Sequence, residues 1–271
     1  MHPPSDPLLD VLRGCAEPLI AVSGGVDSLT LASFAHRAVG GVRMAHAVSP
    51  AVPRAATARV RRFAEVQGWD LAVVEAGEFS DGRYLANPVN RCFYCKTNLY
   101  DRLGGLGAGT VLSGANLDDL GDYRPGLAAA ADHGVRHPFI EAGMDKAAVR
   151  ALARALGLGD VADLPASPCL SSRMETGLAI TADALALVER VETWLAEERG
   201  AKVARCRVRP DGLEIELGAE EHAREHARAG RDGALVEELR RAHPALRGVN
   251  IRIGAYRRGS AFVGDKSVVR P

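Results

Sequence analysis

The chain has 271 residues, enough for one large or two modest domains, and it is 47% hydrophobic and 25% charged, as in an ordinary globular protein. Its 34 basic and 34 acidic residues cancel, which argues against a general nucleic-acid or membrane surface. No apolar run approaches the length that spans a bilayer, and the Pro-rich, acidic start does not look like a signal peptide. We therefore expect a cytoplasmic protein with no nucleic-acid or membrane partner.

The clearest local pattern is a buried strand, a tight turn and a helix close to the N-terminus. An apolar run at 19–22 breaks into Ser23-Gly24-Gly25-Val26-Asp27-Ser28, and an apolar-periodic segment follows at 29–39. The two glycines can take positive φ and let an anion approach the backbone, and the helix N-terminus would face that anion. Hydroxyl groups of serine add donors, and the Asp27 carboxylate suits Mg²⁺. This pattern predicts a phosphate-binding loop, although it lacks the lysine of the G-x-x-x-x-G-K-[ST] motif.

Strands and helices then alternate. Further strands are expected at 42–48, 71–74 and 110–115, and helices at 55–67, 91–103 and 145–156, the last capped by Asp145. This alternation predicts an α/β domain with a parallel sheet, in which ligands lie at the carboxyl ends of the strands. The polar loop that begins at Asn116 lies at such an end, where an enzyme would hold metal and nucleotide; a solvated acidic loop is the alternative.

Five cysteines, an odd number, argue against a disulfide framework: Cys15, Cys92, Cys95, Cys169 and Cys206. We expect Cys15, placed in a first helix, and Cys206 to be buried and inert. Cys92 and Cys95 fall in the first turn of the helix at 91–103, where the helix N-terminus favours thiolates. By itself a C-x-x-C pair indicates half a zinc site, an iron–sulfur fragment, a redox pair or two buried small residues.

The second half of the chain has a different pattern. The irregular segment 164–173, with Cys169 and Arg173, indicates a functional loop, and we place a domain boundary just after it. The domains are then 1–177 and 178–271. The second is predicted as a small α+β domain. It should contain a Thr181-capped helix to residue 199, a hairpin of strands 203–208 and 213–217, helices at 219–229 and 233–242, and a strand at 249–256.

Four motifs in order resemble the LarE family of ATP-dependent sulfur transferases in nickel-pincer cofactor synthesis. They are the Ser-Gly-Gly loop, Asn90-Arg-Cys-Phe-Tyr-Cys-Lys96, Asp118-Asp-Leu-Gly-Asp-Tyr-Arg-Pro-Gly126 and Ser167-Pro-Cys-Leu-Ser-Ser-Arg173. The resemblance covers about residues 8–256 and implies a PP-loop ATP pyrophosphatase domain, of the adenine nucleotide alpha hydrolase-like type. It implies that ATP with Mg²⁺ adenylates a carboxylate of pyridinium-3,5-biscarboxylic acid mononucleotide, after which sulfur displaces AMP to leave a thiocarboxylate.

The resemblance also implies a source for the sulfur. In some members a cysteine at the position of Cys169 is itself the donor, and in others three cysteines hold a 4Fe-4S cluster that carries an extra sulfide. This chain has all three, Cys92, Cys95 and Cys169, and we favour the cluster. No particular sulfide donor is indicated. Family members form multimers, so a homo-oligomer is expected.

Site residues are carried over by position. The residues implied for ATP are Ser23, Gly24, Gly25, Asp27, Ser28, Lys96, Asn116 and Arg173, with Asp27 also on Mg²⁺. Those implied for the substrate phosphate or a subunit contact are Arg207, Arg209 and Glu216.

Two stretches depart from the family pattern. The usual Ile-Pro-Tyr-Gly after the Ser-Arg is Met174-Glu-Thr-Gly177, and the usual Ala-Arg-Ile-Glu is Leu213-Glu-Ile-Glu216. These changes put the family's contacts with the substrate in question, whereas the motifs implied for ATP binding are intact. Two alternatives are a PP-loop tRNA-thiolating or other adenylating enzyme, and a non-enzymatic iron–sulfur or zinc carrier. The net charge of zero disfavours a tRNA-thiolating enzyme, which would bind RNA. The Ser-Gly-Gly loop disfavours a non-enzymatic carrier.

Overall fold

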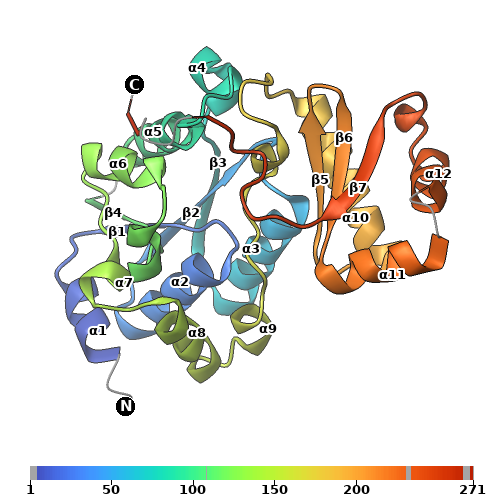
Figure 1. The fold of residues 1–271 in the computed structure, drawn as a ribbon. Coiled ribbons are helices and arrows are strands. Elements are labelled where there is room, and N and C mark those ends of the chain that lie inside the picture. Colours follow the sequence, from blue (N-terminus) through green and yellow to red (C-terminus); the bar gives the residue numbers. More distant parts are fainter. Residues whose placement is uncertain (1–4, 108, 230–232, 265–268, 271) are drawn as a thin grey trace. The chain divides into compact units, whose positions relative to one another are not determined.

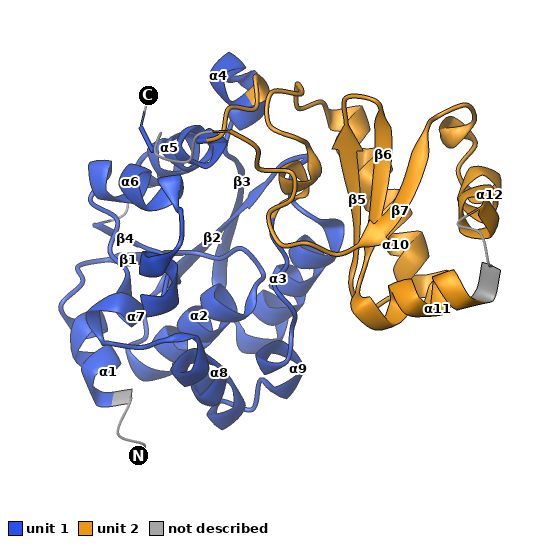
Figure 2. Ribbon diagram, in the orientation of Figure 1, with its two compact units in different colours: residues 1–84, 90–168, 266–271 blue, residues 85–89, 169–265 orange. Residues whose placement is uncertain are grey.

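The computed structural model describes residues 5–107, 109–229, 233–264, 269 and 270. Contacts divide the chain into two compact units (Figure 2). We call residues 1–84, 90–168 and 266–271 the N-terminal unit, and residues 85–89 and 169–265 the C-terminal unit.

The N-terminal unit is built on a four-stranded sheet with the order β3-β2-β1-β4. Its strands are β1 (Pro18–Ala21), β2 (Arg43–Val48), β3 (Asp70–Glu75) and β4 (Thr110–Leu112). All three pairings are parallel, and Ile20 of β1 lies opposite Met44 on one side and Leu112 on the other. The predicted parallel sheet is therefore confirmed, and β4 ends earlier than the predicted range of 110–115. The apolar run of β1 is explained by its interior position, where both faces are covered.

Helices cover both faces of this sheet (Figure 1). One buried cluster joins the sheet to helices α1, α2, α3, α8 and α9, and a second joins it to α5 and α6. The side chain of Asp145 caps α8 as predicted, accepting a hydrogen bond of 2.8 Å from the amide of Ala148. The helices are α1 (Ser5–Arg13), α2 (Val26–Ala38), α3 (Arg54–Gln67), α4 (Gly82–Leu85), α5 (Arg91–Gly104), α6 (Pro125–Asp132), α7 (Pro138–Glu141), α8 (Lys146–Ala155) and α9 (Gly159–Ala162), with 3₁₀ turns at Glu78–Ser80 and Leu117–Gly121.

The C-terminal unit has a three-stranded sheet with the order β5-β6-β7. Strands β5 (Ala204–Arg209) and β6 (Gly212–Leu217) form the predicted antiparallel hairpin, and β7 (Ile251–Ala255) runs parallel to β6. Helix α10 (Ala182–Arg199) begins at the predicted cap, where Thr181 accepts a hydrogen bond of 3.2 Å from the amide of Ala184. The other helices are α11 (Ala219–Ala229) and α12 (Gly233–Ala242), with 3₁₀ turns at Leu170–Arg173 and Pro244–Leu246.

The chain passes from the N-terminal unit to the C-terminal unit between Pro168 and Cys169, earlier than the boundary expected after Gly177. Hydrogen bonding explains the difference. Met174 forms a parallel bridge with Val208, and the amide of Glu175 donates to the Val208 carbonyl at 3.0 Å. Residues 85–89 belong to this unit because the buried amide group of Asn87 donates to the carbonyls of Glu175 and Leu178, at 2.7 and 2.8 Å.

Candidate functional site

The Ser-Gly-Gly loop joins β1 to α2 at the carboxyl end of an interior strand. Gly24 has φ of +83°, and a Cβ there would lie 2.7 Å from the carbonyl oxygen of Ala56, so both its conformation and its surroundings require glycine. Gly25 differs from the prediction, because its φ of −85° is ordinary and it serves as the N-cap of α2. The hydroxyl oxygens of Ser23 and Ser28 lie 3.1 Å apart, and Ser28 Oγ also accepts from the Ser23 amide. The loop is thus closed on itself by its own serines.

Two neighbouring elements hold the loop from outside. The ring of His46, in β2, contacts the Val22 carbonyl oxygen at 2.7 Å through Nδ1 and the Thr57 hydroxyl at 2.9 Å through Nε2. Burial lowers the pKa of His46. From α3, Arg59 donates to the Gly24 carbonyl at 2.7 Å. These contacts hold the carbonyls on either side of Ser23.

Asp27, in the first turn of α2, is paired with a residue that the sequence did not suggest. The ammonium group of Lys146 lies 2.7 and 2.6 Å from the two Asp27 carboxylate oxygens. The amide of Asn116 lies 3.4 Å from Asp27 Oδ1, which brings the predicted polar loop to the same carboxylate. A Cβ on Gly114 would lie 2.9 Å from the Ser28 amide nitrogen, so the chain after β4 approaches α2 closely. No sequence spacing could have paired Lys146 with Asp27, because they are 119 residues apart.

Lys96 lies in the second turn of α5. Its ammonium group is 5.8 Å from the centroid of the Tyr100 ring, and a Cβ on Gly126 would lie 2.9 Å from Lys96 Cγ. The charge of Lys96 helps to lower the pKa of His137, for which burial is the main cause. His137 Nδ1 in turn lies 2.8 Å from the hydroxyl of Ser113, just after β4.

The five cysteines are thiols and form no disulfide. Cys15 and Cys206 are buried, as predicted, and burial raises the pKa of both thiols; Cys15 lies just after α1, not inside it. Cys92 and Cys95 are half-buried in the first two turns of α5, in the N-terminal unit, and Cys169 is exposed in the C-terminal unit. In the part of the chain that the structure describes, no three His, Cys, Asp or Glu side chains are grouped to hold a metal ion. The three-cysteine cluster stays a prediction.

Arg173 supports the loop of Cys169 from within the C-terminal unit. Its side chain is 3% exposed and forms a two-pronged ion pair with Glu192 of α10, at 2.9 and 2.7 Å. The same guanidinium donates to the Cys169 carbonyl oxygen at 3.1 Å. The predicted contact of Arg173 with ATP stays a prediction. Its contacts with Glu192 and with the Cys169 carbonyl position the Cys169 loop.

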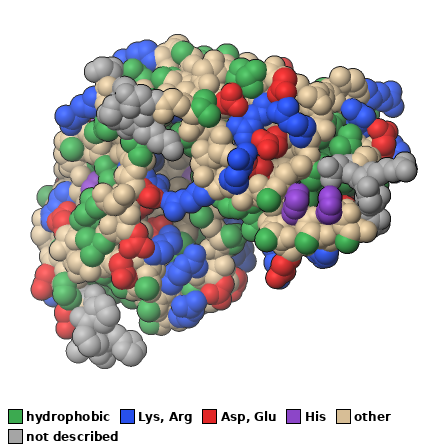
Figure 3. Space-filling model, viewed as in Figure 1, with side chains coloured by type: hydrophobic (Ala, Val, Ile, Leu, Met, Phe, Trp, Pro, Cys, Tyr) green, Lys and Arg blue, Asp and Glu red, His purple; other side chains and the backbone are tan. Residues whose placement is uncertain are grey.

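Arg207 and Arg209 leave the same face of β5, and both are largely buried. Arg207 donates to Glu216 at 2.9 Å and to the Ser172 carbonyl at 3.1 Å. Arg209 pairs with Glu214 and Glu175. Both arginines are therefore paired with carboxylates of the same unit. Figure 3 shows basic and acidic side chains interleaved on the visible face of this unit.

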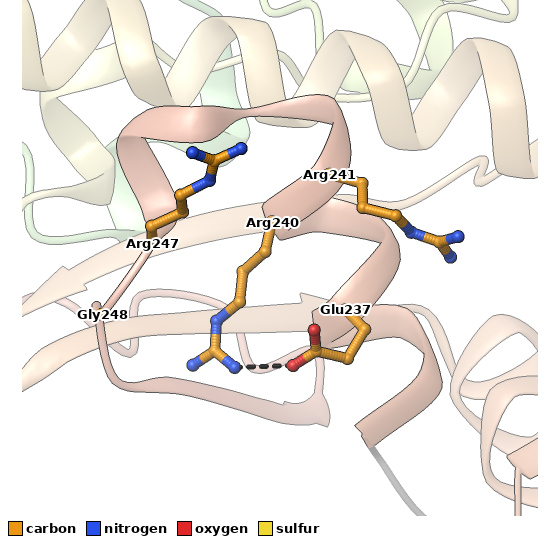
Figure 4. Close-up of a pocket in the computed structure, with 5 residues that line it drawn as sticks. All are labelled: Glu237, Arg240, Arg241, Arg247 and Gly248. Atoms are coloured by element: carbon orange, nitrogen blue, oxygen red, sulfur yellow. Dashed lines mark hydrogen bonds and ion pairs between the residues drawn. The ribbon is translucent and has the colours of Figure 1, made fainter.

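A shallow pocket of about 340 Å³ lies elsewhere in the C-terminal unit, lined by Glu237, Arg240, Arg241, Arg247 and Gly248 (Figure 4). Arg240 is paired there with Glu237 at 2.8 Å and donates to the Val249 carbonyl at 3.0 Å. None of the predicted site residues lines it.

Among the helices of the described residues, none is long and apolar enough to cross a membrane.

Comparison with known proteins gives three similar chains, and no family model matches. The chain is 30% identical over 260 residues to the pyridinium-3,5-bisthiocarboxylic acid mononucleotide synthase of Lactiplantibacillus plantarum, covering 93% of this chain and 91% of the relative. It is 39% identical over 208 residues to an uncharacterized protein of Synechocystis, covering 75% and 77%. An uncharacterized protein of Methanocaldococcus jannaschii is 25% identical over 181 residues, covering 65% and 68%.

The all-parallel sheet with its Ser-Gly-Gly loop, followed by a smaller mixed sheet, has the fold class of a PP-loop ATP pyrophosphatase domain joined to a small α+β domain. The similarity to the synthase extends over nearly the whole of both chains. The chain belongs to the family of this synthase, the LarE family.

Proposed function

We propose that this chain is an ATP-dependent sulfur transferase that acts on a carboxylated pyridinium compound. The observation that carries the proposal is the similarity over 93% of the chain to a synthase named for a bisthiocarboxylic acid product. A carboxylate oxygen of the acceptor attacks the α-phosphorus of ATP and pyrophosphate leaves. A sulfur nucleophile then attacks the activated carbonyl carbon, AMP leaves, and a thiocarboxylate remains. Activation is needed because a free carboxylate is a poor electrophile.

The N-terminal unit supplies groups suited to ATP. The loop at Ser23–Ser28 offers backbone amides at a helix N-terminus, and Gly24 takes a positive φ against the Ala56 carbonyl, where a side chain would not fit. We propose that Asp27 holds the Mg²⁺ that binds the ATP phosphates. Because Lys146 is paired with Asp27, we propose that its ammonium group contacts a phosphate oxygen of the same ATP. Lys96 and Asn116 complete the proposed ATP site.

For the sulfur, we propose that Cys92, Cys95 and Cys169 hold a 4Fe-4S cluster. All three are thiols, and none of them is fully buried. Held by three cysteines, such a cluster would leave one iron without a protein ligand, where a sulfide could be carried. The competing proposal, in which Cys169 itself gives up its sulfur, requires only the exposed thiol.

The test of the reaction is ATP-dependent pyrophosphate release by the full chain with carboxylated pyridinium acceptors, with thiocarboxylate detected by mass. Release that depends on the acceptor, together with a thiocarboxylate, is expected. Pyrophosphate release that no carboxylated acceptor stimulates would contradict the proposed function. Release that depends on RNA would point to tRNA thiolation instead.

The test of the sulfur source is iron and acid-labile sulfide per chain after anaerobic purification. We expect about four irons in the wild type and a loss of iron in Cys92→Ala. Cys206→Ala, which removes a buried thiol, is the control and should retain iron. Absence of iron in the wild type would favour Cys169 as the donor, and its conversion to dehydroalanine would then be sought by mass.

A further inference from the structure

Two histidines lie one turn apart on α11, in the C-terminal unit. His222 and His226 are separated by four positions, so they lie on the same face of the helix. Their rings are nearly parallel, with an interplanar angle of 12° and centroids 6.4 Å apart. His222 is half-buried and His226 is exposed, and Figure 3 shows two histidine side chains next to each other on the surface of this unit. The two imidazoles are therefore close together and open to solvent.

The neighbouring glutamates explain why this pair faces outward. Glu221 and Glu225 each precede one of the histidines by one position, and both are engaged with the rest of the unit. Glu221 accepts from the Lys202 amide at 3.1 Å, and Glu225 pairs with Arg199 of α10 at 2.8 Å. Among the residues that the structure describes, neither histidine ring forms a hydrogen bond or an ion pair. The ring nitrogens of the pair are thus available to a ligand.

This arrangement is suited to a metal ion. Imidazole nitrogen is a ligand of borderline divalent ions such as Zn²⁺ and Cu²⁺, and two histidines four positions apart on one helix offer two such ligands to one ion. Two nitrogens bound to one Zn²⁺ at about 2.0–2.1 Å lie about 3.3 Å apart in tetrahedral geometry. Rings with centroids 6.4 Å apart reach this separation by small rotations of the two side chains.

We propose that His222 and His226 chelate one borderline divalent metal ion, such as Zn²⁺, through one ring nitrogen each. The protein supplies two ligands, and the remaining coordination positions are open to water or to a further ligand from solution. Because there are only two protein ligands, the affinity depends on both histidines acting together. The site uses none of the residues proposed for ATP or sulfur, and it does not depend on the proposed function.

The experiment titrates Zn²⁺ into the full chain by calorimetry, after the accessible thiols are alkylated with iodoacetamide so that cysteines do not take up the ion. His222→Gln and His226→Gln should each weaken the binding by roughly tenfold or more, because a chelate loses its affinity when either ligand is removed. His36→Gln, in the last turn of α2, is the matched control. It should bind Zn²⁺ as the wild type does, since His36 has no histidine four positions away.

A further variant tests the spacing. In His226→Gln, Ala227→His the helix keeps two histidines, but they are five positions apart on different faces, and the tight binding should not return. A wild type that binds Zn²⁺ no more tightly than the single variants would overturn the inference, and so would full recovery in the displaced-histidine variant. Far-UV circular dichroism checks that each variant is folded. If His222→Gln does not fold, the two variants at the exposed position of His226 decide the question.

Discussion

The ammonium group of Lys146, the first residue of α8, bridges both carboxylate oxygens of Asp27, in the first turn of α2. The pair is half-buried, with the two side chains 34% and 27% exposed. It joins the Ser-Gly-Gly loop to a helix that lies far along the chain. Lys146 is thus paired with the carboxylate that we propose for Mg²⁺.

The first prediction concerns this pair. Lys146→Met should reduce ATP-dependent pyrophosphate release by roughly tenfold or more, because a charge proposed for the phosphates is lost. The variant should also bind Mg²⁺ more tightly in the absence of ATP, since Asp27 no longer has a competing cation. Lys202→Met, on an exposed lysine of the C-terminal unit, is the matched control. Unchanged ATP turnover in Lys146→Met would show that the pair is structural only.

The second prediction concerns the glycine of the loop. Gly24→Ala places a methyl group 2.7 Å from the Ala56 carbonyl oxygen at a φ of +83°, so it should weaken ATP binding and destabilise the N-terminal unit. Gly40→Ala shares the left-handed conformation, with φ of +71°, and has open space around it. Gly40→Ala should therefore cost only the backbone term of about 1–2 kcal/mol, measured by urea unfolding. Equal effects of the two changes would mean that the contact with Ala56 is relieved at no cost.

The third prediction is a pH dependence from the buried histidine beneath the loop. Burial lowers the pKa of His46, so the unfolded chain binds the proton more readily than the folded one. The free energy of unfolding should therefore be highest above the ordinary histidine pKa of about 6.5 and fall as the pH drops through it toward the lowered value. His46→Gln should make this fall shallower, and His226→Gln, at an exposed position, should not. Urea unfolding at several pH values measures the slopes, and identical slopes in wild type and His46→Gln would exclude His46 as the cause.

The fourth prediction concerns the ion pair behind Cys169. Glu192→Gln leaves the guanidinium of Arg173, 3% exposed, without its carboxylate, and should lower the free energy of unfolding of the C-terminal unit by about 3–5 kcal/mol. Glu237→Gln, on the exposed pair with Arg240, should cost no more than about 1 kcal/mol. Denaturant unfolding followed by circular dichroism gives both values. Similar small losses in the two variants would mean that Arg173 finds other acceptors.

Local patterns in the sequence predicted the strands of both sheets, the longer helices and the class of fold, but not the short helices α4, α6, α7 and α9. Asp145 and Thr181 were identified as helix caps because capping depends on residues only three positions apart. The Ser-Gly-Gly loop was identifiable for the same reason, since its serines and glycine act within one turn.

Only the tertiary structure decided which distant residues meet. It paired Lys146 with Asp27, and it placed Glu175 and Glu214 on one guanidinium that the sequence had suggested for a phosphate. It also showed that Arg207 is buried against Glu216. The physical reason is that periodicity determines which face of a strand or helix a side chain occupies, whereas its charged partner is set by the packing of elements far apart in the chain.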